Sequence, residues 1–219
     1  MTYAIGDIHG CARALATLLD ALQPGTADTL ICLGDYIDRG PASRDVIDLL
    51  IDAQHTTRLI PLRGNHELHL RRAYTSDDLH DFFLSPRVGG TATVQSYGRT
   101  IHDIPQHHRD FLTQQTVLSH QTDTHIFVHG GLLPHLPLAD HDERTLTSTR
   151  FHAPQPHCSG KTMVCGHTIQ GDLPTRIADH SICIDTGAYA HGWLTAYHVE
   201  TGTYTQTNEQ AHLRTITLP

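Results

Sequence analysis

The sequence predicts an α/β fold in which two packed mixed β-sheets are flanked by helices. Its first half alternates short apolar strands with amphipathic helices, which is typical of βαβ units and parallel strand pairing. Its second half is mostly strand, with a β-hairpin predicted around residues 200–202. The length of 219 residues suits one large domain, and we expect residues 1–219 to form it.

The individual elements follow from apolar spacing and from the turn residues between them. Leucines at helical spacing predict a helix over 11–22 that ends at Pro24-Gly25, and Pro41 opens a second helix that continues to Ile51. Residues 74–104 differ in character from the rest, with an acidic patch and no clear period over 88–98, and we expect an excursion beside the mouth of the active site. A further helix is predicted near 106–115. Apolar runs predict strands at 3–5, 29–33, 59–62, 125–128, 162–165, 181–184, 194–199 and 203–207.

Composition excludes several classes of protein. The net charge of −8 argues against nonspecific nucleic-acid binding, and no apolar run is long enough to cross a membrane. The N-terminus lacks the pattern of a signal peptide, so a cytoplasmic protein is expected. The 5 cysteines form no C-x-x-C pair, which predicts free thiols rather than a disulfide framework.

Three glycine-rich segments follow the first three predicted strands. They are Gly6-Asp7-Ile8-His9-Gly10, Gly34-Asp35-Tyr36-Ile37-Asp38-Arg39-Gly40 and Gly64-Asn65-His66-Glu67. Ligands bind beyond the carboxyl ends of strands in open α/β sheets, so we expect these side chains to meet at one site. Any one segment could be an ordinary turn. Three of them in this order predict a metal and phosphate site.

Three later strands end in similar segments, namely His129-Gly130-Gly131, Gly166-His167-Thr168 and Asp185-Thr186-Gly187. With these and the 90–98 segment Gly90-Thr91-Ala92-Thr93-Val94-Gln95-Ser96-Tyr97-Gly98, the chain resembles metallophosphatases of the phosphoprotein phosphatase type, in the calcineurin-like superfamily. The nearest relatives implied are bacterial and phage serine/threonine phosphatases and symmetrical diadenosine tetraphosphate hydrolases. The resemblance covers nearly the whole chain and implies a four-layer α/β/β/α sandwich.

The resemblance implies a dinuclear metal centre bridged by Asp35. The ligands it implies are Asp7, His9 and Asp35 for one divalent ion, and Asp35, Asn65, His129 and His167 for the other. Oxygen and nitrogen donors without thiolate favour Mn²⁺, with Fe, Zn, Co or Ni as alternatives. Asp185 is expected to orient a histidine ligand by accepting its distal N–H.

The resemblance also implies roles in phosphate chemistry. His66 is expected to be the general acid that protonates the leaving oxygen, held by Asp38. An acidic partner favours a protonated imidazole, so we expect Asp38 to favour that form of His66. The planar guanidinium of Arg39 is expected to bind phosphate. The second such residue is expected to be Arg150, with Arg144 and Arg176 as rivals.

The main functional expectation is hydrolysis of phosphate monoesters of the phosphoserine or phosphothreonine type, by direct attack of a hydroxide that bridges two metals. The alternative is a symmetrical dinucleoside polyphosphate hydrolase, for example of diadenosine tetraphosphate. Asp77, Asp78 and Asp81 would disfavour such an anionic ligand if they lay at the mouth. A third hypothesis is a catalytically silent module that binds phosphorylated partners, although no ligand or acid is missing. The sequence predicts a phosphorylated substrate, no nucleic-acid or membrane partner, and no particular oligomeric state.

Overall fold

The computed structural model describes residues 1–217, which form two mixed β-sheets packed against each other. The first sheet has 6 strands in the order β11-β10-β9-β1-β2-β3. Its parallel half is β1 (Thr2–Ile5), β2 (Thr29–Cys32) and β3 (Arg58–Pro61). The antiparallel half is β9 (Leu194–His198), β10 (Tyr204–Thr207) and β11 (Leu213–Ile216).

The second sheet has 5 strands in the order β4-β5-β6-β8-β7. Its parallel centre consists of β5 (His125–Val128), β6 (Thr162–Cys165) and β8 (Ser181–Cys183). Antiparallel strands close both edges, namely β4 (Ser119–Gln121) and β7 (Thr175–Ile177). The predicted hairpin around residues 200–202 is confirmed as the connection between β9 and β10.

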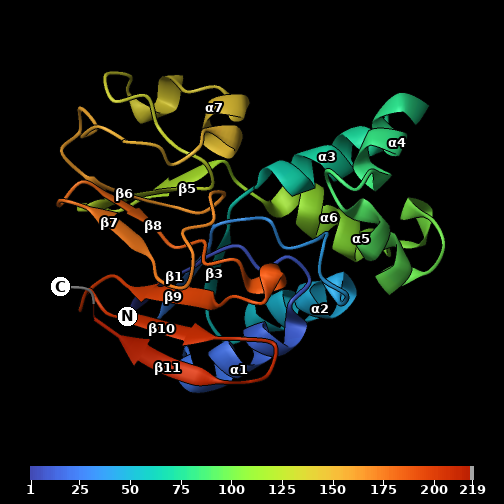
Figure 1. The fold of residues 1–219 in the computed structure, drawn as a ribbon, viewed down its shortest axis with the longest axis horizontal. Helices are drawn as coiled ribbons and strands as arrows, with labels where there is room; N and C mark the ends of the chain where they lie inside the picture. The colour runs from blue at the N-terminus through green and yellow to red at the C-terminus, as the bar shows by residue number, and fades with distance from the viewer. Residues whose placement is uncertain (218–219) are drawn as a thin grey trace.

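Helices cover the outer faces of the two sheets. In Figure 1, α1 and α2 lie against the first sheet, α7 lies over the second, and α3 to α6 gather at one side. The helices are α1 (Ala12–Leu22), α2 (Ser43–Ala53), α3 (Asn65–Ala73), α4 (Asp77–Leu84), α5 (Gly90–Tyr97), α6 (Gln106–Asp110) and α7 (Glu143–Ser148). A π-helical turn at Phe111–Gln115 extends α6, where the sequence predicts one helix. Three 3₁₀ turns lie at Ile101–Asp103, Leu138–Asp140 and Ala188–Ala190.

Three apolar clusters bind these layers together. One lies between the sheets, where Ile31 and Leu33 share a cluster with Phe127 and Val164. A second joins the first sheet to α1 and α2, and a third joins the second sheet to Leu146 of α7. Burial of each large apolar side chain stabilises the fold by roughly 1.5–3 kcal/mol. The predicted four-layer α/β/β/α arrangement is confirmed.

The segment without clear periodicity, residues 74–104, contains two helices and belongs to the main core. Phe83 of α4 and Val94 of α5 are buried in the cluster that holds α1 and α2. Ser76 caps α4 by accepting a hydrogen bond from the Leu79 N–H. The expectation that this segment lies beside the mouth of the site is confirmed by Val88, which lines the cavity described below.

Two further expectations about the chain can be compared with the structure. Within residues 1–217, no helix combines the length and apolar character that crossing a membrane requires. All five cysteines are free, and those at positions 11, 32, 165 and 183 are buried. The prediction of free thiols is therefore confirmed, and burial raises the pKa of the Cys11 thiol to about 12, so it stays protonated.

Candidate active site

A cavity of about 540 Å³ opens where the loops after several strands meet. The loops after β2 and β3 supply Asp35 and Asn65, and the loop after β6 supplies His167. The connection between α4 and α5 and the segments after α7 and β8 complete the wall. The residues that line it are Asp35, Arg39, Asn65, His66, His69, Phe82, Arg87, Val88, Ser148, Arg150, His167, Thr168, Ile169 and Tyr189.

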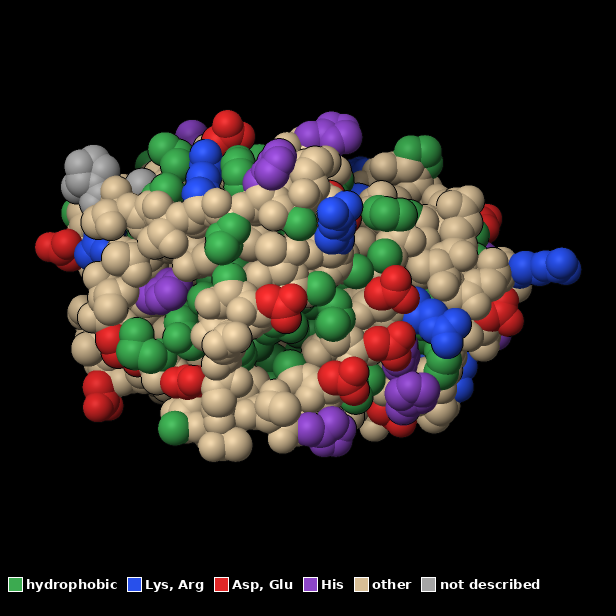
Figure 2. All heavy atoms as spheres, turned by 90° about the horizontal axis from the view of Figure 1, so that it is seen from below, with side chains coloured by type: hydrophobic (Ala, Val, Ile, Leu, Met, Phe, Trp, Pro, Cys, Tyr) green, Lys and Arg blue, Asp and Glu red, His purple; other side chains and the backbone are tan. Residues whose placement is uncertain are grey.

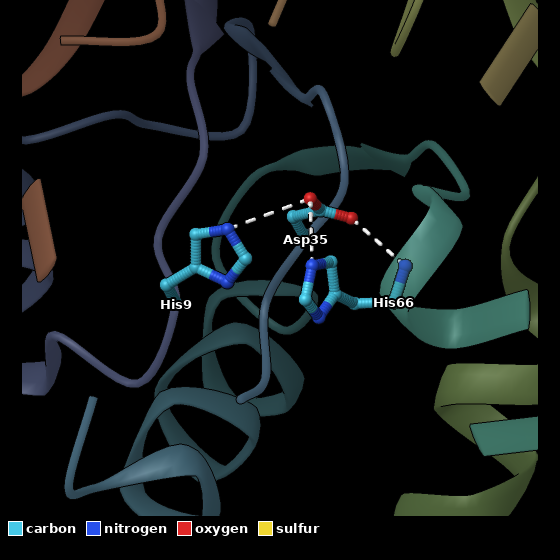
Figure 3. Close-up of side chains that lie close together, drawn as sticks. All are labelled: His9, Asp35 and His66. Atoms are coloured by element: carbon cyan, nitrogen blue, oxygen red, sulfur yellow. Dashed lines mark hydrogen bonds and ion pairs between the residues drawn. The ribbon is translucent and has the colours of Figure 1, made fainter. Parts of the chain in front are cut away.

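Asp35 is the point on which the site converges. Its Oδ2 lies 3.5 Å from Nε2 of His9, 3.8 Å from Nε2 of His66 and 3.4 Å from Nε2 of His129. Figure 3 shows His9 and His66 pointing at this carboxylate, whose Oδ1 also accepts the backbone N–H of His66 at 3.1 Å. Asp35 is only 2% exposed, so this carboxylate is shielded from bulk water.

The other predicted ligands lie around the same carboxylate. Nε2 of His129 is 3.1 Å from Oδ1 of Asn65, and Asp35, His129 and His167 present their ligand atoms within 4.8 Å of one another. His9, Asp35 and His66 form a second such group. Asp7 belongs to neither group, but both of its oxygens accept the His167 N–H, at 3.1 and 3.0 Å. The structure therefore brings all six predicted ligands together.

Left-handed backbone is concentrated at this site. His9, Asp35 and His167 have φ values of 48°, 51° and 65°, and Asp38 and Arg39 have 72° and 69°. Such conformations cost about 1–3 kcal/mol each and persist only where surrounding structure imposes them. They turn the chain sharply after the strands, and Asp35, Arg39 and His167 line the cavity, whereas His9 and Asp38 lie buried beside it.

His66 is held by a buried polar chain. Its Nδ1 lies 2.7 Å from Oδ2 of Asp38, which is fully buried. The Thr93 hydroxyl donates to Oδ1 of Asp38 at 2.6 Å and accepts the Asp38 N–H at 2.8 Å. The predicted His66–Asp38 pair is present. Nothing in the local spacing of Thr93 predicts this contact, because it joins residues 55 positions apart.

Glu67 fixes the two ligand loops relative to each other. Its carboxylate accepts the N–H groups of Asp35, Tyr36 and Gly64 at 2.9, 2.9 and 2.8 Å. Burial raises the pKa of Glu67 to about 7. Gly34 approaches the same loop so closely that a Cβ there would lie 2.5 Å from the Gly64 nitrogen. This role of Glu67 is not predicted above, although a glutamate at the third position of a helix is typical of a capping box.

Burial and mutual charge set the proton affinities. Burial lowers the pKa of His9 to about 3, of His66 to about 4 and of His167 to about 3. Burial also acts to lower the pKa of His129, but the Asp35 and Asp7 carboxylates raise it to about 10. Negative charge on Asp35 acts to raise the pKa of His66, in the direction expected of an acidic neighbour, but burial outweighs it, so the net shift is downward. Burial likewise raises the pKa of Asp38 well above its usual range.

The donor chemistry of this cluster fits divalent cations. Imidazole, carboxylate and amide groups surround Asp35, with no thiolate among them. Metal-ligating histidines normally bond through their other nitrogen to a nearby acceptor. Here Nδ1 of His9 meets the Ile37 carbonyl at 2.8 Å, and Nδ1 of His129 meets the Leu33 carbonyl at 3.0 Å. These contacts leave both Nε2 atoms directed at Asp35.

The prediction that Asp185 accepts the distal N–H of a histidine ligand is wrong. Carbonyl groups hold the distal nitrogens of His9 and His129, whereas Oδ1 of Asp185 accepts the Gly187 N–H at 3.0 Å. Burial raises the pKa of Asp185 to about 6. Burial, together with the charge of Asp185, also raises the pKa of Asp7 well above its usual range. Asp185 therefore acts on Asp7 through charge and on its own loop through a hydrogen bond.

Arginines dominate the charged lining of the cavity. Arg39 and Arg150 both line it, as predicted, whereas the rivals Arg144 and Arg176 do not. Arg176 instead pairs with Asp179 at 3.2 Å. Arg39 packs over the Tyr189 ring at 4.7 Å. Arg39 forms no ion pair with its neighbour Asp38, whose carboxylate bonds to His66 and Thr93. A third arginine in the lining is Arg87, for which the sequence predicts no role.

The acidic side chains lie elsewhere. Asp77, Asp78 and Asp81 do not line the cavity, and Asp77 borders a different hollow beside His102. Figure 2 shows another acidic surface, over α1, where Asp and Glu side chains surround apolar ones. Asp20 and Asp52 border the groove between α1 and α2 on that side. Asp77, Asp78 and Asp81 do not form the mouth of the cavity, so the expectation that they disfavour an anionic ligand there is wrong.

Comparison with known proteins identifies the family. A family model described as calcineurin-like phosphoesterase matches residues 2–171. The chain belongs to this family. It is 31% identical over 176 residues to the symmetrical bis(5'-nucleosyl)-tetraphosphatase of Methylobacillus flagellatus, covering 73% of this chain and 55% of the relative. The protein of the same name from Nitrosomonas europaea is 32% identical over 139 residues, covering 61% and 45%. The chain thus spans about half the length of the curated relatives it matches.

Solved structures share the metallophosphoesterase fold. A proposed diadenosine tetraphosphatase superposes with a TM-score of 0.68 at 21% identity, covering 98% of this chain and 92% of the other. A protein serine/threonine phosphatase from Saccharomyces cerevisiae superposes with a TM-score of 0.58 at 16% identity, covering 100% and 80%. These similarities support the fold. The chain therefore belongs to the metallophosphoesterase family, whose members use a dinuclear divalent metal centre.

Proposed function

We propose that this metallophosphoesterase hydrolyses the phosphoanhydride of dinucleoside polyphosphates such as diadenosine tetraphosphate. The observation that carries the hydrolytic assignment is the convergence of three imidazoles on one buried carboxylate, Asp35, at 3.4–3.8 Å. The choice of substrate is supported by the names of the curated relatives and by three arginines in the cavity lining. This proposal reverses the order expected from the sequence, in which phosphate monoesters came first.

In the proposed site, Asp7, His9 and Asp35 would hold one divalent ion, and Asp35, Asn65, His129 and His167 would hold the other. When bound, these ions lower the pKa of a water molecule and neutralise charge on the phosphate. We take Mn²⁺ as the preferred ion because the donors are oxygen and nitrogen. Glu67 fixes the distance between two of the ligand loops through the three N–H groups that it accepts.

Residues of the chain then position and divide the substrate. Arg39 and Arg150 bind the phosphoryl oxygens. The attacking water gives up one proton to solvent as its oxygen bonds to phosphorus, and the bridging P–O bond breaks with its electron pair on the departing oxygen. His66, held by Asp38, supplies a proton to that oxygen. A bound phosphate adds negative charge beside His66 and favours its protonated form, which offsets the effect of burial. Symmetrical cleavage of diadenosine tetraphosphate in this way yields two ADP molecules.

One observation favours the second candidate, a phosphomonoesterase of the serine/threonine type. The His66–Asp38 pair is a buried general acid, and a proton donor matters most when the leaving group is a strongly basic alkoxide. The two candidates share every residue named above. They differ only in the group that departs.

A side-by-side rate comparison tests the choice. The metal-loaded protein is assayed with diadenosine tetraphosphate, a phosphoserine peptide and p-nitrophenyl phosphate, with chromatographic detection of ADP. We expect kcat/KM for the tetraphosphate to exceed that for the phosphopeptide by about tenfold or more, with ADP as the product. Chelation should abolish all three activities, and added Mn²⁺ should restore them. Faster turnover of the phosphopeptide would make the monoesterase the better assignment.

A further inference from the structure

One wall of the cavity continues from His66 towards solvent. The ring of His66 lies 6.1 Å from that of His69, and the ring of His69 lies 5.1 Å from that of Phe82. The guanidinium carbon of Arg87 ends this row, 6.0 Å from the Phe82 ring centre. All four side chains line the cavity. A general acid must contact the oxygen that departs, so this wall is the leaving-group side.

Arg87 is exposed at the end of this wall with its charge uncommitted. Within residues 1–217, the arginine ion pairs involve Arg44, Arg63, Arg71 and Arg176, so none involves Arg87. The guanidinium carbon of Arg87 lies over the face of the Phe82 ring, whose π electrons attract a cation. An arginine that lines a cavity without a carboxylate partner is free to bind an anion.

The backbone places Arg87 at a fixed position relative to the rest of the site. The Gly89 carbonyl, two residues further on, accepts the Arg39 N–H at 3.2 Å. Gly89 adopts a φ of +89°, and a Cβ there would lie 3.0 Å from Cγ of Arg39. Val88, between them, is buried in the main core. Arg39 and Arg87 therefore belong to segments joined by a backbone hydrogen bond, with Arg39 nearer Asp35 and Arg87 further out.

We propose that Arg87, supported by Phe82, binds an anionic leaving group, namely the terminal phosphates of a departing nucleoside polyphosphate. This inference rests on the proposed function and assigns one residue to the part of the substrate beyond the phosphorus under attack. An alcohol that leaves a phosphate monoester is neutral once protonated and offers Arg87 no charge. A departing nucleoside diphosphate carries phosphate oxygens that a guanidinium can bind through two N–H groups at once. Arg87 is thus a specificity residue for anhydrides.

Equilibrium binding tests this assignment without requiring turnover. Calorimetry on the metal-loaded full chain compares a methylene-bridged, non-hydrolysable analogue of diadenosine tetraphosphate with inorganic phosphate. We expect Arg87→Ala to weaken binding of the analogue by about tenfold or more and to leave binding of inorganic phosphate within about twofold. Arg87→Lys should recover part of the loss because it keeps the charge. Arg99→Ala removes an exposed arginine outside the cavity lining and should bind both ligands as the wild type does.

Kinetics give a second readout. Arg87→Ala should raise KM for diadenosine tetraphosphate and leave both parameters for p-nitrophenyl phosphate unchanged. Equal losses with both ligands, or undiminished binding of the analogue, would overturn the subsite. If the wild type binds the analogue through Arg87 but releases no ADP, the proposed substrate is wrong and the subsite stands. If the wild type releases ADP and Arg87→Ala binds the analogue normally, only the subsite is wrong.

Discussion

The inner and outer parts of the cavity are built in opposite ways. The inner part consists of buried groups that already have partners: Asp35 faces three imidazoles, and His66 bonds to Asp38. The outer part consists of exposed arginines, and neither Arg87 nor Arg150 has an ion-pair partner among residues 1–217. A fixed inner cluster suits chemistry that is the same for every substrate. An uncommitted outer rim suits recognition of the groups that differ between substrates.

The largest expected effect comes from the centre of the inner part. Asp35→Asn removes the negative charge on which His9, His66 and His129 converge. We expect turnover of every substrate to fall by at least about 10³-fold, together with loss of bound metal measured by mass spectrometry. Asp123→Asn, an exposed aspartate in a turn, is the matched control. Normal rates with full metal content in Asp35→Asn would show that the inner cluster is not the catalytic centre.

His66 tests whether the inner part contains two separate functions. It lies in one ligand group with His9 and Asp35, yet its other nitrogen bonds to Asp38. As a general acid, His66→Asn should lower turnover of the phosphoserine peptide, whose leaving alkoxide is strongly basic, by about 10²-fold and keep the bound metal. The loss should be smaller for diadenosine tetraphosphate, whose leaving phosphate needs less protonation. Loss of metal on this substitution would instead assign His66 as a ligand.

Glu67 contacts neither metal nor substrate in this account, so its substitution should have an intermediate effect. Glu67→Gln replaces one of the oxygens that accept N–H groups from Asp35, Tyr36 and Gly64 with a donor. We expect metal affinity to fall by about 10–100-fold, and the free energy of unfolding to fall by about 1–3 kcal/mol. Saturating Mn²⁺ should recover most of kcat. Full stability and unchanged metal affinity would mean that the loops hold their positions without Glu67.

The smallest effects are expected at the outer rim, where they should depend on position. Arg150 lines the cavity and Arg144, on the neighbouring helix α7, does not. Arg150→Ala should raise KM for phosphate substrates by about tenfold with little change in metal content, whereas Arg144→Ala should change neither. If Arg144→Ala raised KM and Arg150→Ala did not, Arg144 would be the second phosphate-binding arginine.

The inner part could be predicted from the sequence and the outer part could not. Asp7, His9, Asp35, Asn65, His129 and His167 each follow an apolar strand directly, and parallel strands end at one edge of a sheet, so local position predicts that these side chains meet. Arg87 lies in a segment without periodicity, and its place at the rim depends on how α4 and α5 pack into the core through Phe83 and Val94. Tertiary packing of that kind leaves no local pattern.

The direction of one electrostatic effect was also inaccessible from sequence. The pairing of His66 with Asp38 that the resemblance implies favours a protonated imidazole, but both side chains are almost completely buried, and burial lowers the pKa of His66 to about 4. The acidic segment around Asp77 was misplaced for a related reason. Its sequence position beside the site does not say which way α4 presents its carboxylates; none of them lines the cavity, and Asp77 borders another hollow.

The central claim is that two ions share Asp35, and anomalous diffraction from crystals grown with Mn²⁺ tests it most directly. The account predicts two manganese peaks on either side of the Asp35 carboxylate, one beside His9 and the other beside His129 and His167. A further weak peak at the separate group formed by Asp48, His107 and His108 would leave the claim intact. A single peak, or none within coordination distance of Asp35, would contradict it.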